Sequence, residues 1–386
     1  MGDRATAVNP RMLIWARQRA GYGLDDVAAK LKKPPETIAS WEDGSGAPTF
    51  RQLEELAEVL YKRPVALFFF PNPPPEPSAK SQFRTLPASE LQDLEPDTLY
   101  AVREALGFRE SLRELAGGNP VEHSITRDMH ADLSVPVAEL ASSARAYLKV
   151  SLDTQFSWAS AEDAFKEWRR SVEAAGVFVF KRAFKQQGIS GFCLYDEAFP
   201  LVVINNSTAH ARQTFTLFHE LGHLLFWVGG ITKDDLRYIR RLTGTNRDIE
   251  VACNRFAAES LVPEASFPWR EFQQADVFSS IDRVADRYRV SREVILRRLL
   301  DRGLVDEKIY DDRVAAWNKE FQESRAARAA GGNYYATQAT YLGERYLQLA
   351  FAQYYAGRVS LEELAGHLGV KARNVPRLED FLTGAR

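Results

Sequence analysis

The sequence predicts an α+β protein in which helices predominate. Over most of the 386 residues, apolar side chains recur three or four positions apart, which is the spacing of one face of an α-helix. Between residues 177 and 204 the period shortens to two, which indicates the short strands of a small sheet. Five of the eight residues from 71 to 78 are proline, so a helix cannot continue there and an extended spacer is expected.

The elements follow in order along the chain. Five short helices are expected between residues 10 and 70, and three longer amphipathic helices between about residues 90 and 176. Gly176 is placed as the C-terminal cap of the last of these. The longer helices are predicted over 91–108, 135–150 and 161–176, and the strands over 177–180, 191–195 and 201–204. After the polar residues 205–207, the helical period returns and persists nearly to the end of the chain.

These patterns divide the chain into four parts. Residues 1–71 are expected to form a five-helix domain, and residues 72–81 a proline-rich linker. Residues 82–275 are expected to form a domain that contains the small sheet. Residues 276–386 are expected to form a helical C-terminal region.

Composition narrows the class of protein. Hydrophobic residues make up 45% and charged residues 26%, which is typical of a soluble globular chain. The formal net charge of −2 gives no bulk electrostatic argument for nucleic acid or an anionic membrane. Two cysteines, Cys193 and Cys253, cannot build a disulfide framework, and no run of about 18 apolar residues occurs. A cytoplasmic protein without a membrane segment is therefore expected.

The first part of the chain has the pattern of a helix-turn-helix. Helices 24–31 and 35–42 are separated by a tight turn, Gly44 ends the second, and the small Ala28 allows them to cross closely. This segment resembles the repressor-type (Xre/Cro-like) helix-turn-helix family. The residues that carry the resemblance are Leu24, Val27, Ala28, Leu31, Thr37, Ile38, Trp41, Glu42, Gly44, Pro48, Leu53 and Leu56.

The resemblance implies DNA as a partner, with Lys33, Thr37 and Ser40 as candidate contacts on the exposed face, beside Glu36. Through residue 71, ten basic residues face nine acidic ones, a smaller excess than phosphate-driven binding usually shows. Two interpretations therefore stand: a DNA-binding domain, or a module for docking a protein or forming a homodimer.

The middle of the chain contains His219-Glu220-Leu221-Gly222-His223. Residues four apart share one face of a helix, so His219 and His223 can present their imidazoles to one metal ion. Glu220 then lies beside the metal as a candidate general base. The alternative, two histidines on a solvated helix, conflicts with the apolar residues around them.

A third ligand is expected from the helix that follows. Glu250 and Asn254 are four apart, so both can face the metal, with Glu250 as ligand and Asn254 as a hydrogen-bond partner of a ligand. Cys253 is turned away from that face and is expected to be a small buried residue. Two imidazoles, one carboxylate and an open position are typical of catalytic zinc, so the predicted cofactor is Zn and the predicted chemistry is hydrolysis.

With these motifs in place, residues 80 to 375 resemble the ImmA/IrrE family of intracellular metallopeptidases. The motifs are Gly191, residues 200–205, residues 212–223, and residues 250–263. The resemblance implies a zincin-like peptidase domain in which His219, His223 and Glu250 bind zinc and Glu220 is the base. Phe218 and Cys253 depart from the family pattern, in which alanine is usual, and the span from His223 to Glu250 is longer than typical. His210 or Arg212 is expected either to stabilise an oxyanion or to make a structural hydrogen bond.

Two later segments also have helix-turn-helix spacing. The first is residues 281–295, and the overlapping stretch 283–302 contains seven arginines and three acidic residues. It is expected either to contact phosphates or to serve as scaffold around the metal site. The second, residues 360–370, is acidic and is expected to be a packing or partner module, with His367 outside any metal site.

Two functions fit these features. The first is a cytoplasmic regulatory zinc metalloendopeptidase, fused to a DNA-binding domain, that cleaves or inactivates a partner regulatory protein encoded nearby. The second is a DNA-binding regulator or antitoxin that neutralises a toxin partner by binding, with a non-catalytic metal site. An intact Glu220 favours the first, because a structural zinc needs no base. The helix-turn-helix in the same chain favours the second, because the usual peptidase of this family acts on a separate repressor.

Overall fold

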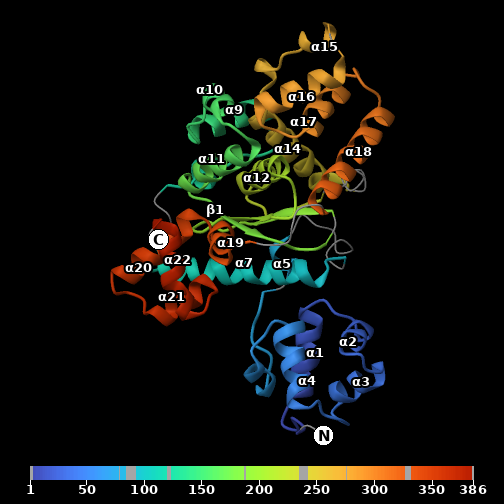
Figure 1. Cartoon of the computed structure of the whole chain (residues 1–386), viewed down its shortest axis with the longest axis vertical. Coiled ribbons are helices and arrows are strands. Elements are labelled where there is room, and N and C mark those ends of the chain that lie inside the picture. Colours follow the sequence, from blue (N-terminus) through green and yellow to red (C-terminus); the bar gives the residue numbers. More distant parts are fainter. Residues whose placement is uncertain are drawn as a thin grey trace. The chain divides into compact units, whose positions relative to one another are not determined.

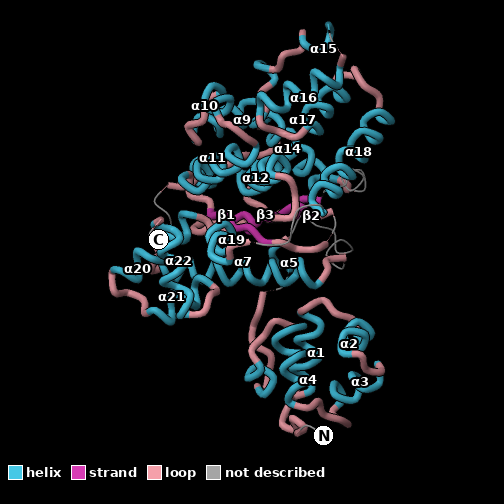
Figure 2. Tube along the Cα trace, viewed as in Figure 1, coloured by secondary structure: helices cyan, strands magenta, loops and turns pink. Residues whose placement is uncertain are grey.

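The structure is a computed structural model, and it describes residues 3–77, 79–83, 93–119, 123–186, 188–233, 242–274, 276–326 and 332–384. The chain forms two compact units. The first contains the described residues up to Gln82 and those from 93 to 104. The second contains Phe83 and the described residues from Ala105 onward. The predicted fold class is confirmed: helices predominate, and they surround one small sheet (Figures 1 and 2).

The first unit is an array of short helices (Figure 1). They are α1 (Pro10–Arg19), α2 (Leu24–Leu31), α3 (Pro35–Asp43), α4 (Phe50–Glu54), the π-helical η1 (Glu55–Leu60) that continues it, the 3₁₀-helix η2 (Val65–Phe69), and α5 (Ala79–Gln82). Helices α2 and α3 pack against each other, and Ala28 and Ile38 are both buried in their shared core. Gly44 ends α3 in the left-handed conformation with φ 83°, which a residue with a side chain rarely adopts.

The sheet of the second unit has the strand order β1-β3-β2-β4. Its strands are β1 (Phe178–Arg182), β2 (Ile189–Leu194), β3 (Leu201–Asn205) and β4 (Ile231–Lys233). Strand β1 pairs with β3 in parallel, whereas β2 runs antiparallel to both β3 and β4. The first three strands lie within a residue or two of their predicted positions. β4 was not predicted, because three residues are too few to show a period of two.

Helices cover both faces of this sheet. Val179 belongs to the core beneath α11 (Ala161–Ala174) and α12 (His210–Leu225). The next residue, Phe180, stacks on Phe108 of α7 (Pro96–Leu115) with ring centroids 4.5 Å apart. Phe180 also contacts Tyr346 of α20 (Glu344–Tyr355). Neighbouring residues of a strand point to opposite faces, so the side chains of β1 contact the helix layers on both sides of the sheet.

The helices of the second unit have the following bounds. They are α7 (Pro96–Leu115, of which the part from Ala105 belongs to this unit), α8 (Ile125–Asp128), α9 (Val137–Tyr147), α10 (Leu152–Ser157), α11 (Ala161–Ala174), α12 (His210–Leu225), α14 (Gly244–Leu261), η3 (Glu264–Ser266), α15 (Glu271–Gln274), α16 (Val277–Tyr288), α17 (Arg292–Asp301), α18 (Glu307–Ala326), α19 (Tyr334–Leu342), α20 (Glu344–Tyr355), α21 (Leu361–Leu368), η4 (Ala372–Asn374) and α22 (Val375–Thr383). Two of them begin later than predicted, α7 at Pro96 and α9 just after Pro136. Proline lacks the N–H that a helix interior requires, so each helix starts at or after it.

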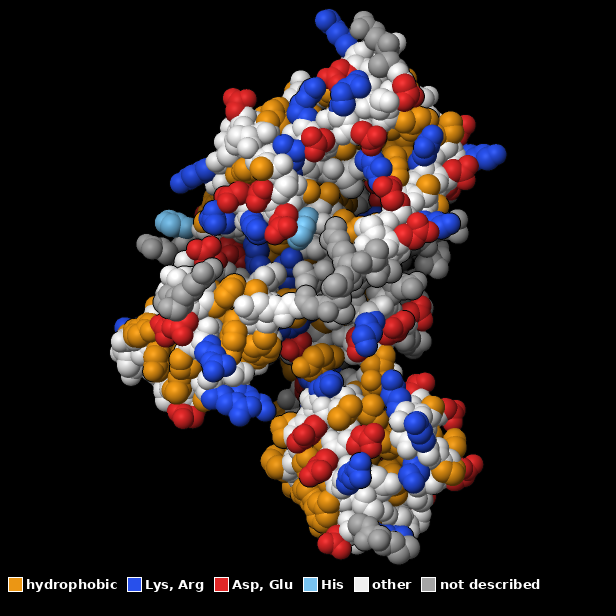
Figure 3. All heavy atoms as spheres, viewed as in Figure 1, with side chains coloured by type: hydrophobic (Ala, Val, Ile, Leu, Met, Phe, Trp, Pro, Cys, Tyr) orange, Lys and Arg blue, Asp and Glu red, His pale blue; other side chains and the backbone are white. Residues whose placement is uncertain are grey.

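Several arginines of α16 and α17 pair with acidic side chains, many of them from other elements. Arg298 pairs with Glu259 at 2.8 Å and with Glu264 at 2.8 Å, and Arg292 pairs with Glu320 at 2.8 Å. Figure 3 shows basic and acidic side chains interspersed over the region of α16 to α18. This pairing favours the scaffold interpretation over phosphate contacts for the segment.

None of the described helices is both long and apolar enough to cross a membrane.

Candidate metal centre

Helix α12 carries the two histidines at the middle of the second unit. Its apolar residues Leu217, Phe218, Leu221 and Leu224 are fully buried and anchor the helix between the sheet and α14. Gly222 allows α14 to approach closely, since a Cβ at that position would lie 3.2 Å from Phe256 and 3.3 Å from Cys253. The helix therefore has one packed orientation, which directs His219 and His223 to the same side.

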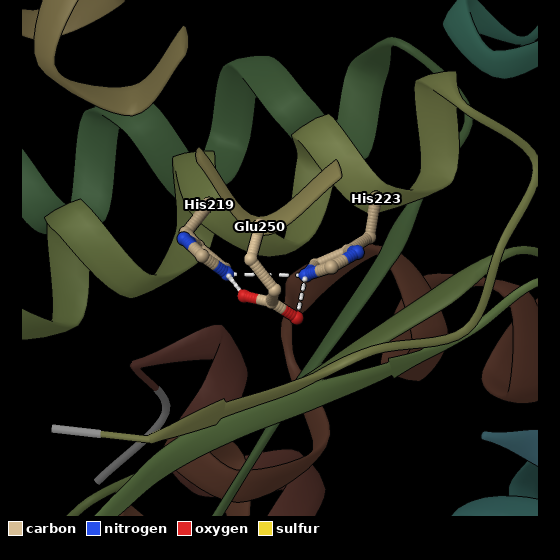
Figure 4. A group of neighbouring side chains, drawn as sticks. All are labelled: His219, His223 and Glu250. Atoms are coloured by element: carbon tan, nitrogen blue, oxygen red, sulfur yellow. Dashed lines mark hydrogen bonds and ion pairs between the residues drawn. The ribbon is translucent and has the colours of Figure 1, made fainter. Parts of the chain in front are cut away.

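The structure brings His219, His223 and Glu250 together (Figure 4). The Nε2 atoms of the two histidines are 3.1 Å apart. One carboxylate oxygen of Glu250, Oε2, lies 3.3 Å from His219 Nε2, and the other, Oε1, lies 3.3 Å from His223 Nε2. All three side chains are buried.

This donor set fits a zinc ion. Bonds of about 2.0–2.1 Å in tetrahedral geometry place neighbouring ligand atoms about 3.3 Å apart, close to the three observed separations. Two imidazoles and one carboxylate are the donors that zinc prefers in catalytic sites, where the fourth position stays open. Apart from its contact with His223 Nε2, the buried Glu250 Oε1 makes no hydrogen bond with the described residues.

Asn254 holds the ring of His219. The Nδ1 atom of His219 lies 3.1 Å from Asn254 Oδ1. An amide oxygen only accepts, so Nδ1 donates the hydrogen and the lone pair of Nε2 faces Glu250 and His223. That is the tautomer that a metal ligand requires.

Glu220 is fully buried beside the cluster and is held by the edge strand. Its Oε1 accepts hydrogen bonds from the backbone N–H of Thr232, at 3.0 Å, and from the Thr232 hydroxyl. Its Oε2 has no hydrogen-bond partner among the described residues. Burial raises the pKa of Glu220, although the two imidazoles and Thr232 oppose that shift.

The electrostatics of Glu250 differ from those of Glu220. Burial alone would raise the pKa of Glu250, but His223 and His219 beside it lower the pKa overall. Glu250 is therefore held as a carboxylate that can bind a cation, whereas the pKa of Glu220 is shifted in the opposite direction.

Gly230 forms the wall behind His223. A Cβ on Gly230 would lie 2.5 Å from Cδ2 of His223 and 2.7 Å from its Nε2. The Gly230 carbonyl accepts from the Cys193 N–H at 3.0 Å, and the Gly230 N–H donates to Cys193 Sγ at 3.3 Å. The backbone is thus fixed against the imidazole at a distance that only glycine allows.

The remaining candidates are not part of the His-His-Glu cluster. Arg212 donates to Glu293 Oε2 at 2.7 Å, and His210 stacks on Phe165, so each has a structural partner. Cys253 is fully buried beneath Gly222, as expected for a small packing residue. His367 lies 3.9 Å from Glu114, outside the metal cluster.

In the first unit, the candidate DNA contacts gather around the start of α3. Lys33 is exposed, and Thr37 and Ser40 are half-buried. The Ser40 hydroxyl donates to the Thr37 carbonyl at 2.8 Å. Arg17 fixes the end of the same helix by a bidentate ion pair with Glu42 at 2.7 and 2.8 Å.

Three residues of the site were missed from the sequence: Thr232, Gly230 and Cys193. Gly229 and Gly230 follow the histidine helix, and a glycine so close to a metal motif can indicate a close approach of the backbone. Thr232 lies two residues after Gly230. Nothing in the sequence indicated Cys193, because its contact with Gly230 depends on the pairing of β2 with β4.

The fold and the site together define a zincin-like peptidase-family domain combined with a helix-turn-helix domain. Residues 172–300 match the family model of the IrrE N-terminal-like domain of peptidase family M78, and residues 13–65 match a helix-turn-helix model. The chain thus carries an ImmA/IrrE-type domain behind an Xre-type helix-turn-helix, and the resemblance predicted from the sequence is confirmed. No curated protein matches the chain.

Proposed function

We propose that the chain is a zinc-dependent metalloendopeptidase that cleaves a partner regulatory protein encoded nearby, and that its first unit binds DNA. The observation that carries the proposal is the triangle of His219, His223 and Glu250, whose donor atoms have the separations of zinc ligands. The match to a peptidase family over residues 172–300 supports it.

In this proposal, His219, His223 and Glu250 hold the zinc, and Asn254 orients His219 through its Nδ1 hydrogen. A zinc ion held there would polarise the scissile carbonyl and increase the acidity of the attacking water. Glu220 takes the proton from the attacking water and transfers it to the leaving amine. Thr232 fixes one oxygen of Glu220, which leaves Oε2 to exchange the proton.

Glu220→Gln tests the catalytic role. The substitution keeps the shape of the side chain and leaves the three proposed ligands intact, so zinc should be retained. General acid–base catalysis contributes roughly 10²–10⁴ in rate, so cleavage of the products of adjacent genes should become undetectable. In cells, the variant should behave like a deletion of the gene.

The helix-turn-helix match at residues 13–65 favours a second candidate, a regulator or antitoxin that acts on its toxin partner by binding alone. The same variant separates the two candidates. If Glu220→Gln retains zinc and full biological activity, the peptidase proposal fails and the binding protein takes its place.

For the first unit, we propose that α3 meets DNA through Lys33, Thr37 and Ser40. Full-length protein should shift a fragment of its own promoter region in a salt-sensitive manner, because phosphate contacts release counterions. Lys33→Glu should weaken the shift, whereas Arg270→Glu, an exposed change in the second unit, should not. Absence of any shift at low salt would favour protein docking or dimer formation instead.

A further inference from the structure

A pocket of about 350 Å³ adjoins the metal cluster. Helices α12, α14, α17 and α18 and strands β2 and β4 contribute to its wall.

Two lining residues connect this pocket directly to the cluster. Asn254 accepts a hydrogen bond from His219, and Thr232 donates two to Glu220. A group bound in the pocket therefore lies one side chain away from both the proposed ligands and the proposed base.

The wall carries five arginines and a single acidic residue, Glu293. Glu293 is already engaged, since it accepts from Arg212 at 2.7 Å and from the Tyr310 hydroxyl at 3.1 Å. Arg297 pairs with Asp301 at 2.9 Å, and Arg298 pairs with Glu259 at 2.8 Å. Three of the five positive charges are therefore compensated within the fold.

Arg247 and Arg255 are the remaining two. Both are exposed and lie on α14, on either side of Glu250 in sequence. Neither makes an ion pair or a side-chain hydrogen bond with any residue that the structure describes. Within the described part of the chain these two guanidinium groups have no acidic partner, and each can form bidentate hydrogen bonds with a carboxylate.

The rest of the wall suits an acidic side chain as well. Phe215, Val251, Val294 and Ala258 provide apolar surface for its methylene groups.

We infer that this pocket binds an aspartate or glutamate side chain of the peptide substrate, next to the bond that is cleaved, and that Arg247 and Arg255 recognise its carboxylate. The inference rests on the proposed peptidase function and names the class of substrate for that site. The free C-terminal carboxylate of a peptide has the same chemistry, so the test must separate the two sources.

Three peptide hydroxamates of otherwise identical sequence provide the probes, because hydroxamates anchor to zinc without being cleaved. One carries a glutamine side chain and an amidated C-terminus, the second a glutamate and an amidated C-terminus, and the third a glutamine and a free C-terminus. The variable residue is placed next to the hydroxamate in one series and one residue further in another. Calorimetry on zinc-loaded full-length protein measures their affinities.

In wild type, the glutamate probe should bind about tenfold or more tightly than the glutamine probe, the effect of one charge-assisted hydrogen bond. Arg247→Gln and Arg255→Gln should each reduce this preference, and the double variant should abolish it. The three variants should lose more affinity for the glutamate probe than for the glutamine probe. Arg270→Gln, an exposed arginine outside the pocket, should bind all probes like wild type.

Equal binding of the glutamate and glutamine probes by wild type would overturn the inference, as would a preference that survives in the double variant. A preference for the free C-terminus alone would mean that the pocket binds the end of a peptide and not an acidic side chain. Failure of every probe to bind would also overturn the inference. The proposed function fails separately. A glutamate preference without cleavage of any protein would contradict the proposed peptidase function. Cleavage without that preference would contradict only the proposed role of the pocket.

Discussion

Gly230→Ala should disrupt the metal centre without removing any proposed ligand. The new Cβ would lie 2.5–2.7 Å from three atoms of the His223 ring. Carbon atoms in contact are normally about 3.5–4.0 Å apart, so the overlap is about 1 Å. The ring is fully buried, and hydrogen bonds to Cys193 hold the Gly230 backbone on the other side.

The imidazole must therefore move, and His223 Nε2 moves with it. Zinc sites tolerate deviations of about 0.2 Å in their bond lengths, so a displacement near 1 Å should weaken binding strongly. Overpacking of this kind also costs about 1–3 kcal/mol of unfolding free energy. Both effects should be visible in one variant.

Zinc affinity is measured by competition with a chromogenic chelator, and stability by denaturant unfolding with and without zinc. Gly107→Ala is the matched control, because a Cβ there would meet nothing within 4 Å and the residue lies inside α7. That change should leave zinc binding intact and stabilise the protein by about 0.5–1 kcal/mol. Wild-type zinc affinity and stability in Gly230→Ala would refute the reasoning.

Two further predictions concern buried charges. Burial lowers the pKa of Lys181 to about 7, far below its value in the unfolded chain, so the protonated form destabilises the fold. The loss of unfolding free energy caused by the protonated lysine is complete below pH 7 and vanishes above about pH 10.5. Lys181→Met should therefore raise the unfolding free energy by a few kcal/mol at pH 7, and this gain should disappear toward pH 10.5. Denaturant unfolding across this range checks it, with the exposed Lys319→Met as control, and a gain independent of pH would contradict it. Arg17→Met should destabilise the first unit by about 1–3 kcal/mol, because the Glu42 carboxylate loses the two hydrogen bonds that Arg17 donates to it. Unchanged rates of hydrogen exchange in α1 to α3 would count against this prediction.

The metal cluster could be predicted because it depends on helical periodicity. His219 and His223 share a face of one helix, Glu250 and Asn254 share a face of the next, and an i, i+4 spacing is visible in any sequence. The structure brings the donor atoms of the first three together, with Asn254 against His219.

Other parts of the site depend on contacts between distant segments. The hydrogen bonds between Thr232 and Glu220 require β4, a strand of three residues that pairs with β2. The arginine excess of residues 283–302 was compatible with phosphate binding in the sequence, but Glu259, Glu264 and Glu320 compensate it in the fold. Local charge counts do not reveal such partners, because the acids come from other elements.

The zinc content of the purified full-length protein tests the central claim most directly. The account predicts about one zinc per chain by elemental analysis, held by His219, His223 and Glu250. It predicts loss of that zinc in His223→Ala, while the exposed control Lys319→Met retains it. A wild-type protein that binds no zinc when the ion is supplied, or a His223→Ala variant that retains one zinc per chain, would contradict the assignment.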